Sequence, residues 1–263
     1  MKRLLLLSLA LALSACAARV PPRPSGTTTP DPTAVDQFKA ATKACTGFRS
    51  LLAELSLSGK AGTEKIRGRV HAGLERGGTA LGGAVRLEGV APFGAPVFIL
   101  AGKNDQATLL LPRDHRVLRD TAVATVLERL TGLALSADDL RLILSGCLVE
   151  NASPADGRRW GSGWQAVTVG DRTAYLGAQQ GRTVVVAADF GQWRVDYADY
   201  QGDWPRTVRV RRVDGGADIT ARIGELEVNT TIDPAAFAVT IPPDFDPMTI
   251  DELRSVLVIK EDW

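Results

Sequence analysis

Residues 69–88 read RVHAGLERGGTALGGAVRLE, and they carry the pattern that decides the fold. Apolar side chains alternate with polar or charged ones in both halves of this stretch, at Val70, Ala72 and Leu74 and then at Val85 and Leu87. Such alternation is typical of β-strands with one buried face and one solvated face. Gly77-Gly78 lies between the two halves and predicts a hairpin turn, so we expect an antiparallel pair of strands.

The same alternation returns in the second half of the chain, after Trp160. The apolar positions there are Trp193, Val195, Tyr197, Val208, Val210, Ile219, Ala221 and Ile223. Asp214-Gly215-Gly216 predicts a further hairpin turn between two of these strands. We therefore expect a mainly β (α+β) protein built on an antiparallel sheet.

Three segments follow a helical period instead. Spacings of three and four residues predict one amphipathic helix from Val35, with an apolar face made of Phe38, Ala41, Cys45, Phe48, Leu52 and Leu55. A second helix around Val126 should end at Gly132. A third should begin at Ser136, with Asp139 completing a capping box, and end at Gly146.

Residues 35–263 are predicted to form a single domain, because no repeat or linker-like break interrupts them before about residue 230. Three helices are too few to cover the apolar face of a wide sheet. Either the sheet closes on itself, or an apolar cavity remains for a ligand. The composition does not distinguish these alternatives.

The first sixteen residues resemble the export signal of a bacterial lipoprotein. Lys2 and Arg3 precede an apolar stretch of about ten residues, too short to span a bilayer. It ends in Leu13-Ser14-Ala15-Cys16, which resembles the lipobox, where the signal is cut before the cysteine and the cysteine is acylated. We predict a signal peptide over residues 1–15 and a covalent acyl and diacylglyceryl lipid on Cys16, with no other cofactor. The alternative is a secretory signal that ends in these residues by chance.

Residues 16–34 are predicted to be the lipidated cysteine and a tether. They hold five prolines among Ser, Gly and Thr residues and show no apolar periodicity. Proline-rich chain extends by about 3.1 Å per residue, so this tether would reach roughly 50 Å. Ala17 follows the cysteine, where an Asp would favour retention in the inner membrane. We expect a domain anchored to the outer membrane and facing the periplasm.

Charge and motifs exclude several classes of function. The chain has 31 Lys and Arg against 30 Asp and Glu, and removal of residues 1–15 leaves 29 against 30, so a nucleic-acid partner is not expected. We find no phosphate-binding loop, zinc-protease motif or nucleophile elbow. His71 is expected on a solvated strand face and His115 in a turn. We therefore predict no catalytic residue, no metal site and no enzyme activity.

Two cysteines remain once Cys16 is set aside. Cys45 lies on the apolar face of the first expected helix, and Cys147 follows the third helix. In an oxidising periplasm such a pair favours a disulfide, which would close a loop of about 100 residues. The alternative is two small, buried, free thiols.

The most unusual segment runs from Val90 to Val97. It carries no charge and places Phe93 between Pro92 and Gly94, in what should be a turn between strands. Turns usually lie in water and are polar. Either Phe93 folds back into the core of the domain, or it protrudes and enters a membrane as amphipathic anchors do. The residues alone leave both alternatives open.

Four features together resemble the LolB family of outer-membrane lipoprotein receptors, part of the LolA/LolB-like lipoprotein-localisation group. They are, in chain order, the lipobox, Ala91-Pro92-Phe93-Gly94 followed by Pro96–Leu100, the stretch Leu127–Leu133 and the stretch Leu140–Leu144. No single motif is specific, and the order and spacing carry the resemblance.

The resemblance implies a highly curved, unclosed antiparallel β-barrel with a helical lid over an apolar cavity. It implies that the cavity receives the acyl chains of lipoproteins from a LolA-like periplasmic carrier and delivers them to outer-membrane lipid. Pro92, Phe93 and Gly94 would form the membrane-insertion loop, with Phe93 where the family commonly has Leu. We expect a monomer.

Three features depart from the family. They are the extension after about Thr230, the pair Cys45 and Cys147, and the long proline-rich linker. The alternative function is therefore a LolA/LolB-like lipoprotein that binds or senses lipid and has no transfer role.

Overall fold

The computed structural model describes residues 23–78, 82–91, 93, 95–147, 153–161 and 163–253. The helices are α1 (Pro32–Ala41), η1 (Lys43–Cys45), α2 (Val123–Thr131), α3 (Ala137–Ser145) and η2 (Pro234–Phe237). The strands of the first half are β1 (Thr28–Pro30), β2 (Ser50–Ala61), β3 (Glu64–Glu75), β4 (Ala84–Val90), β5 (Ile99–Lys103), β6 (Gln106–Leu111) and β7 (Arg116–Ala122). The later strands are β8 (Pro154–Trp160), β9 (Gln165–Val169), β10 (Arg172–Gln179), β11 (Arg182–Phe190), β12 (Trp193–Ala198), β13 (Thr207–Arg212), β14 (Ala217–Val228) and β15 (Asp246–Pro247).

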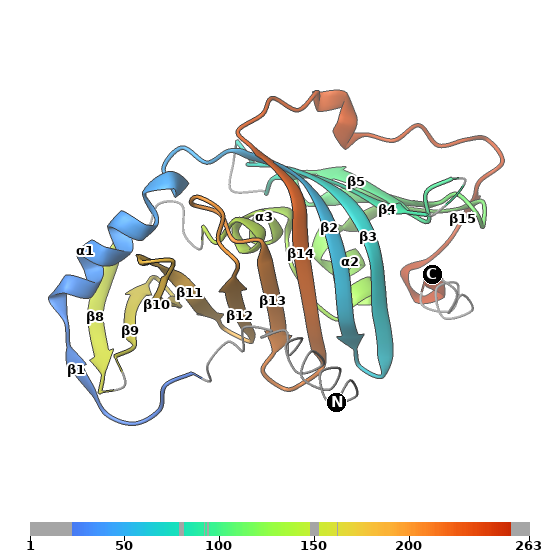
Figure 1. The fold of residues 1–263 in the computed structure, drawn as a ribbon. Helices are drawn as coiled ribbons and strands as arrows, with labels where there is room; N and C mark the ends of the chain where they lie inside the picture. The colour runs from blue at the N-terminus through green and yellow to red at the C-terminus, as the bar shows by residue number, and fades with distance from the viewer. Residues whose placement is uncertain are drawn as a thin grey trace, which may run out of the picture.

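In the described residues these strands form one curved sheet (Figure 1) in the order β1-β8-β9-β10-β11-β12-β13-β14-β2-β3-β4-β5-β6-β7-β15. All neighbours are antiparallel except β15, which pairs with β7 in parallel. The edge strands β1 and β15 are not joined to each other, so the sheet does not close. The predicted class, a mainly β protein with a curved, unclosed antiparallel sheet, is confirmed.

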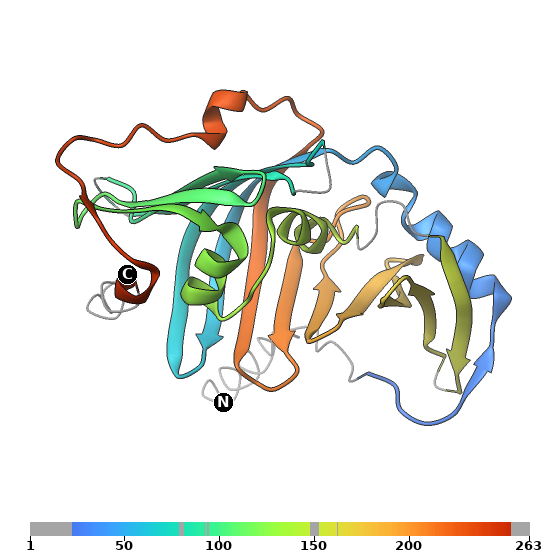
Figure 2. The same ribbon diagram turned by 180° about the vertical axis from the view of Figure 1, so that it is seen from behind.

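The helices cover the inner face of this sheet in two places. The first helix, α1, packs on β8, β9 and β11, whereas α2 and α3 pack on the strands from β2 to β7 (Figure 2). Predicted apolar positions such as Val70, Val195 and Val208 are buried between the two layers. Both predicted hairpins are also present, since β3 pairs with β4 and β13 pairs with β14.

Both short helices end where the sequence predicts, and α3 also begins where it predicts. Gly132 ends α2 and Gly146 ends α3, each with a φ near +75°, in the left-handed region that favours glycine. At the start of α3 the backbone N–H of Asp139 donates to Ser136 Oγ, and the backbone N–H of Ser136 donates to the Asp139 carboxylate. This is the predicted capping box, with Asp in place of the usual Glu.

The first helix is much shorter than predicted. It ends at Ala41, a single turn of 3₁₀-helix follows, and Leu52 and Leu55 lie in β2. Gly47, with φ +79°, ends the helical segment. Residues 51–55 satisfy a strand period as well as a helical one, and β2 gains antiparallel partners on both sides, β3 and β14. Pairing with strands distant in sequence therefore overrides the local pattern.

The predicted boundary of the tether at residue 34 is also corrected. Thr28–Pro30 pairs with β8, and α1 begins at Pro32. Between them, the Asp31 carboxylate accepts hydrogen bonds from Thr33 Oγ1 at 2.6 Å, Arg159 Nε at 2.8 Å and Gln165 Nε2 at 2.9 Å. The chain is therefore part of the fold well before Val35. Residues 1–22, with Cys16 and the predicted signal peptide, lie outside the described residues.

An arginine near the start of the described chain binds the outer face of the sheet. Arg23 forms ion pairs with Asp196, whose side chain is 1% exposed, and with Asp189. Its guanidinium also donates to the carbonyl oxygens of Ala188 and Val195, and lies over the ring of Tyr175. These contacts fix the chain to β11 and β12 at residue 23.

The hydrogen bonds at Asp31 predict a pH-dependent contribution to stability. They hold the pKa of this carboxyl well below its usual range, Thr33 having the largest effect, followed by Gln165. The stabilisation is therefore fully present above the unfolded-state pKa near 4 and is lost as the pH falls through the lower folded-state value. We expect Asp31→Asn to lower the free energy of unfolding in urea at pH 7, with a gap to the wild type that narrows below pH 4. Asp36→Asn, an exposed position on the same helix, is the control; a gap for Asp31→Asn that is equal at both pH values would contradict this account.

The extension after residue 230 packs on the same sheet. Ile232 and Phe237 pack against Ala84 on the outer face, and Asp246–Pro247 then pairs with β7. Met248 and Leu253 enter the main hydrophobic core. In Figure 1 this segment, coloured orange to red, leaves the end of β14, runs above β2, β3 and β5 and then descends to β15. Of the helices in the described ranges, none has both the length and the apolar character to cross a bilayer.

Candidate functional site

An apolar cavity of about 260 Å³ lies between the inner face of the sheet and the helices α2 and α3. Leu55, Val70 and Val210 line it from the strands, and Leu127, Leu133 and Leu144 line it from the helical side. Of the two outcomes predicted for the wide sheet, the structure therefore shows the open sheet with a cavity. Its volume is just below the range of about 300–1,000 Å³ typical of small-molecule sites.

Small residues in the strands leave part of this volume empty. Gly68 in β3 lies between the inward-facing Ile66 and Val70, and a Cβ atom added there would meet no atom within 4 Å. At Gly89 in β4, the ring of Phe98 lies 2.6 Å from the place a Cβ would take. Gly68 thus provides space in the cavity, and Gly89 lets Phe98 pack against its wall. A glycine at an inward position of an alternating strand is the signal for the cavity that the sequence prediction missed.

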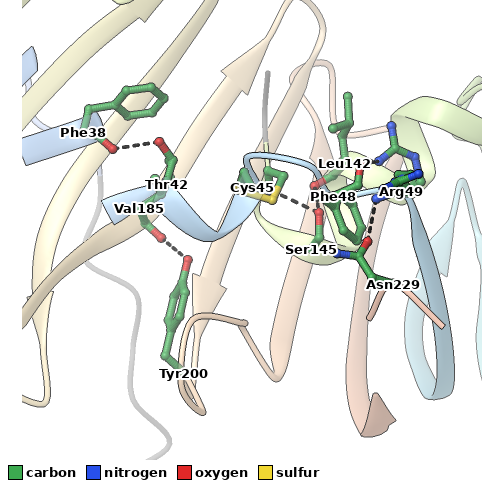
Figure 3. Close-up of a disulfide and its surroundings, with 12 residues drawn as sticks. Phe38, Thr42, Cys45, Phe48, Arg49, Leu142, Ser145, Val185, Tyr200 and Asn229 are labelled. Carbon is green, nitrogen blue, oxygen red and sulfur yellow. Dashed lines mark hydrogen bonds between the residues drawn. A yellow bond between two sulfur atoms is a disulfide. The ribbon is translucent and has the colours of Figure 1, made fainter. Parts of the chain in front are cut away.

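The helical cover is attached to the rest of the fold at the end of α3. Cys45 and Cys147 form a disulfide, with an S–S distance of 2.09 Å and Cα atoms 5.5 Å apart. Figure 3 shows its surroundings, with Ser145 of α3 and Phe48 near Cys45. The disulfide connects η1, just before β2, to the residue after the C-cap of α3. Of the two alternatives for these cysteines, the structure has the bonded one.

A buried arginine adds a second attachment. Arg141 in α3 is fully buried, and its Nη1 donates to the carbonyl oxygen of Phe48 at 3.4 Å. Its guanidinium lies 4.8 Å from the centre of the Phe48 ring and binds Asp138 at 3.3 Å. These contacts satisfy the charge inside the protein and hold α3 against the segment that enters β2.

The loop with the exposed aromatic leaves from the wall of the cavity. Val90 and Phe98 both line the cavity, and Phe93 lies between them in sequence with a side chain that is 90% exposed. Phe93 therefore does not fold back into the core. Among the described residues only one other large apolar side chain is exposed, Val213 at 57%. Pro92 and Gly94, the other predicted loop residues, lie outside the described residues, so the membrane-insertion role of the loop stays a prediction.

The histidines lie apart from the cavity. His71 is exposed on β3, and His115 lies in the turn before β7, where its Nδ1 is 2.7 Å from Asp244 Oδ2. Across the ranges that the structure covers, no three His, Cys, Asp or Glu side chains are grouped so that they could hold a metal ion.

No protein-family model matches the chain, and no curated protein sequence matches it significantly. Solved structures align with it over most of their length. An outer membrane lipoprotein-sorting protein domain from Vibrio parahaemolyticus aligns with 13% identity and a TM-score of 0.47, over 77% of this chain and 97% of that chain. A DUF1329 family protein from Desulfovibrio piger aligns with 12% identity and a TM-score of 0.47, over 80% of this chain and 97% of that chain. A LolA superfamily protein from Nitrosomonas europaea aligns with 10% identity and a TM-score of 0.46, over 80% of this chain and 98% of that chain.

Proposed function

We propose that this protein is an outer-membrane lipoprotein, anchored through Cys16, that receives lipoproteins from a LolA-like periplasmic carrier and delivers their acyl chains to the membrane. One observation carries the proposal: the loop with the exposed Phe93 begins and ends at residues that line the apolar cavity. The resemblance of the sequence to the LolB family supports the same function.

The proposed mechanism needs no covalent step. Each methylene that moves from water into the cavity contributes about 0.8 kcal/mol of binding free energy, so the affinity for an acyl chain increases with the number of methylenes buried. Transfer follows from differential affinity, from the carrier to this cavity and then to the bilayer. Val90 and Phe98 join the cavity to the loop, so a chain that leaves on this side emerges beside Phe93.

The size of the cavity sets a further requirement. A volume of about 260 Å³ is small for a ligand with several long chains. We therefore expect α2 and the α2–α3 connection to move outwards when cargo enters. The end of α3 stays attached through Cys147 and Arg141.

A series of substitutions at Gly68 tests the cavity. We expect Gly68→Phe to fill the space beside Leu55 and Val70 and to weaken binding of a palmitoylated peptide by at least about 100-fold, since several methylenes of about 0.8 kcal/mol each are excluded. Gly68→Ala adds one methyl group and is the matched control, with nearly unchanged affinity. The affinity is measured by fluorescence titration, and thermal unfolding checks that both variants fold. Unchanged binding by folded Gly68→Phe would show that acyl chains do not occupy this cavity.

The second candidate function is lipid binding or sensing without transfer. It is favoured by the two attachments of α3, the disulfide and the buried Arg141, which oppose wide opening of the cavity. The two functions differ in one measurement. A carrier loaded with a labelled lipoprotein should lose its cargo to this protein if the transfer proposal holds, and should keep it if the protein only binds lipid.

A further inference from the structure

One segment of the large sheet has an open edge. Strand β2 pairs with β3 from Glu64 to Glu75, whereas β4 pairs only with Arg69–Glu75, so that β3 extends past β4 (Figure 1). Among the described residues, positions 64–68 of β3 therefore have a strand on one side only. Proteins usually cover or shorten such an edge, because its unpaired backbone groups accept a further strand.

The backbone groups at this edge follow from the hydrogen bonds of the same strand. The N–H of Arg76, the residue after β3, donates to the carbonyl oxygen of Arg49 on the β2 side. In an antiparallel sheet, successive residues direct their N–H and C=O groups alternately to the two sides of the strand. The pairing of β2 with β3 has no register shift, so Lys65, Arg67 and Arg69 direct these groups away from β2. Arg69 faces β4, whereas Lys65 and Arg67 face no strand in the described chain.

The apolar cavity extends to this edge. On β2, β13 and β14 only inward-facing residues line it, but on β3 every residue from Glu64 to Val70 does. The side chains of Lys65 and Arg67 lie on the outer face of the sheet, so the backbone of this segment is the part that borders the cavity. Gly68 lies on the inner face and has no side chain to separate the edge from the cavity.

We propose that the open edge of β3 binds, as an added strand, the polypeptide that follows the acylated cysteine of a cargo lipoprotein. The inference rests on the proposed function, because it takes the cavity as the site of the acyl chains of the cargo. Those chains are attached to the first residue of a lipoprotein, so acyl chains in a cavity that reaches this edge bring the next residues beside it. An extended segment there exchanges hydrogen bonds with the backbone of Lys65 and Arg67.

Strand addition also fits the chemistry of such cargo. In an added strand, alternate side chains face the inner side of the sheet, so an acylated cysteine at one of these positions directs its lipid towards Gly68 and the cavity. The binding energy comes from main-chain groups, which every polypeptide has. The edge therefore accepts lipoproteins that share a lipidated first residue and differ in the sequence that follows it.

Synthetic ligands separate the contribution of the polypeptide from that of the lipid. The probes are dipalmitoylglyceryl cysteine amide, a lipopeptide with about five residues after the same cysteine, and two forms of this lipopeptide that are N-methylated at alternate residues. With the full chain, we expect the lipopeptide to bind at least about tenfold more tightly than the lipid amide, because it adds several backbone hydrogen bonds. Only alternate residues of an added strand bond to β3, so one N-methylated form should lose this gain and the other should keep it.

Hydrogen exchange at single amides shows where the peptide binds. In the free protein, the amides of Lys65 and Arg67 should exchange fast, whereas that of Gly68, which faces β2, should exchange slowly. Saturating lipopeptide should slow exchange at Lys65 and Arg67 by at least about tenfold, and the lipid amide should leave both fast.

A proline at the edge tests the same backbone groups from the side of the protein. Arg67→Pro removes an N–H that faces away from β2, which is the position where a strand tolerates proline. We expect the lipopeptide to lose most of its advantage over the lipid amide in this variant. Arg67→Ala keeps the N–H and removes only the outward side chain, so it should keep the advantage. Thermal unfolding checks the fold of both variants, and the N-methylated ligands give the same test on the wild type.

The outcomes separate this inference from the function on which it rests. Equal binding of lipopeptide and lipid amide, or fast exchange at Lys65 and Arg67 with lipopeptide bound, overturns the strand-addition site and leaves the cavity as an acyl-chain site. Slow exchange at these amides in a ligand-free dimer assigns the edge to a second copy of this chain and also overturns the inference. Failure of the lipid amide to bind overturns instead the proposal that the cavity holds acyl chains.

Discussion

Under the proposed transfer function, we expect Phe93→Glu to slow the delivery of acyl cargo to membranes by about 10- to 100-fold and to leave the binding of cargo in the cavity unchanged. The side chain is 90% exposed, so the substitution removes no packing from the folded domain. Burying a Phe side chain in an apolar medium gains about 1.5–3 kcal/mol, and each 1.4 kcal/mol corresponds to a factor of ten. A carboxylate at the same position must stay in water, so the proposed entry of the loop into the bilayer would be prevented.

The measurement is the rate at which a labelled lipoprotein moves from a loaded carrier into vesicles that carry the full-length protein. Val213→Glu is the matched control, because Val213 is the other exposed large apolar residue of the described chain. It lies in the turn directly after β13 and does not line the cavity. We expect the control to deliver cargo at the wild-type rate. Equal rates for Phe93→Glu and the wild type would remove the loop from the mechanism and would favour the lipid-sensing function.

We expect the replacement of both cysteines, Cys45→Ala with Cys147→Ala, to lower the free energy of unfolding by about 3–5 kcal/mol. The disulfide connects residues 102 positions apart, and in the loop-entropy model a closed loop of this length restricts the unfolded chain strongly. Alanine is preferred to serine because Cys147 is buried, where a hydroxyl would need a new hydrogen-bond partner.

Denaturant unfolding with and without a thiol reductant checks this result. The reductant should destabilise the wild type to about the level of the double variant, and it should leave the variant itself unchanged. The variant also tests the role of the attachment in binding, since a freer α3 should accept and release acyl chains faster. A wild type that is insensitive to reductant after full unfolding and refolding would contradict a stabilising disulfide.

The parts of the fold that depend on local chemistry follow directly from the sequence. Ser136 and Asp139 satisfy each other at the start of α3, and Gly132 and Gly146 adopt the backbone that ends a helix, so these boundaries could be predicted. Leu52 and Leu55 could not be placed in the same way. Their spacing fits both periods, and their true partners in β3 and β14 lie about 20 and 170 residues further along the chain.

The same distinction between local and long-range determinants applies to the candidate site. Hydrophobic periodicity identifies the apolar residues that face the interior, but it does not show whether the space between them is filled. The sequence therefore predicts these residues as inward-facing without locating the cavity. The position of Phe93 was ambiguous for a related reason, since a nearby apolar pocket could have buried it.

The binding of Arg23 to Asp196 shortens the free chain between Cys16 and the folded domain. With a lipid on Cys16, only residues 17–22 separate the membrane anchor from a side chain fixed to the outer face of β12. Seven residue steps span at most about 25 Å, half the reach that the whole proline-rich segment would have if it were free. If Cys16 carries the proposed lipid, the domain is therefore kept within about one molecular diameter of the bilayer. With such an anchor, the exposed Phe93 would stay close to the membrane surface.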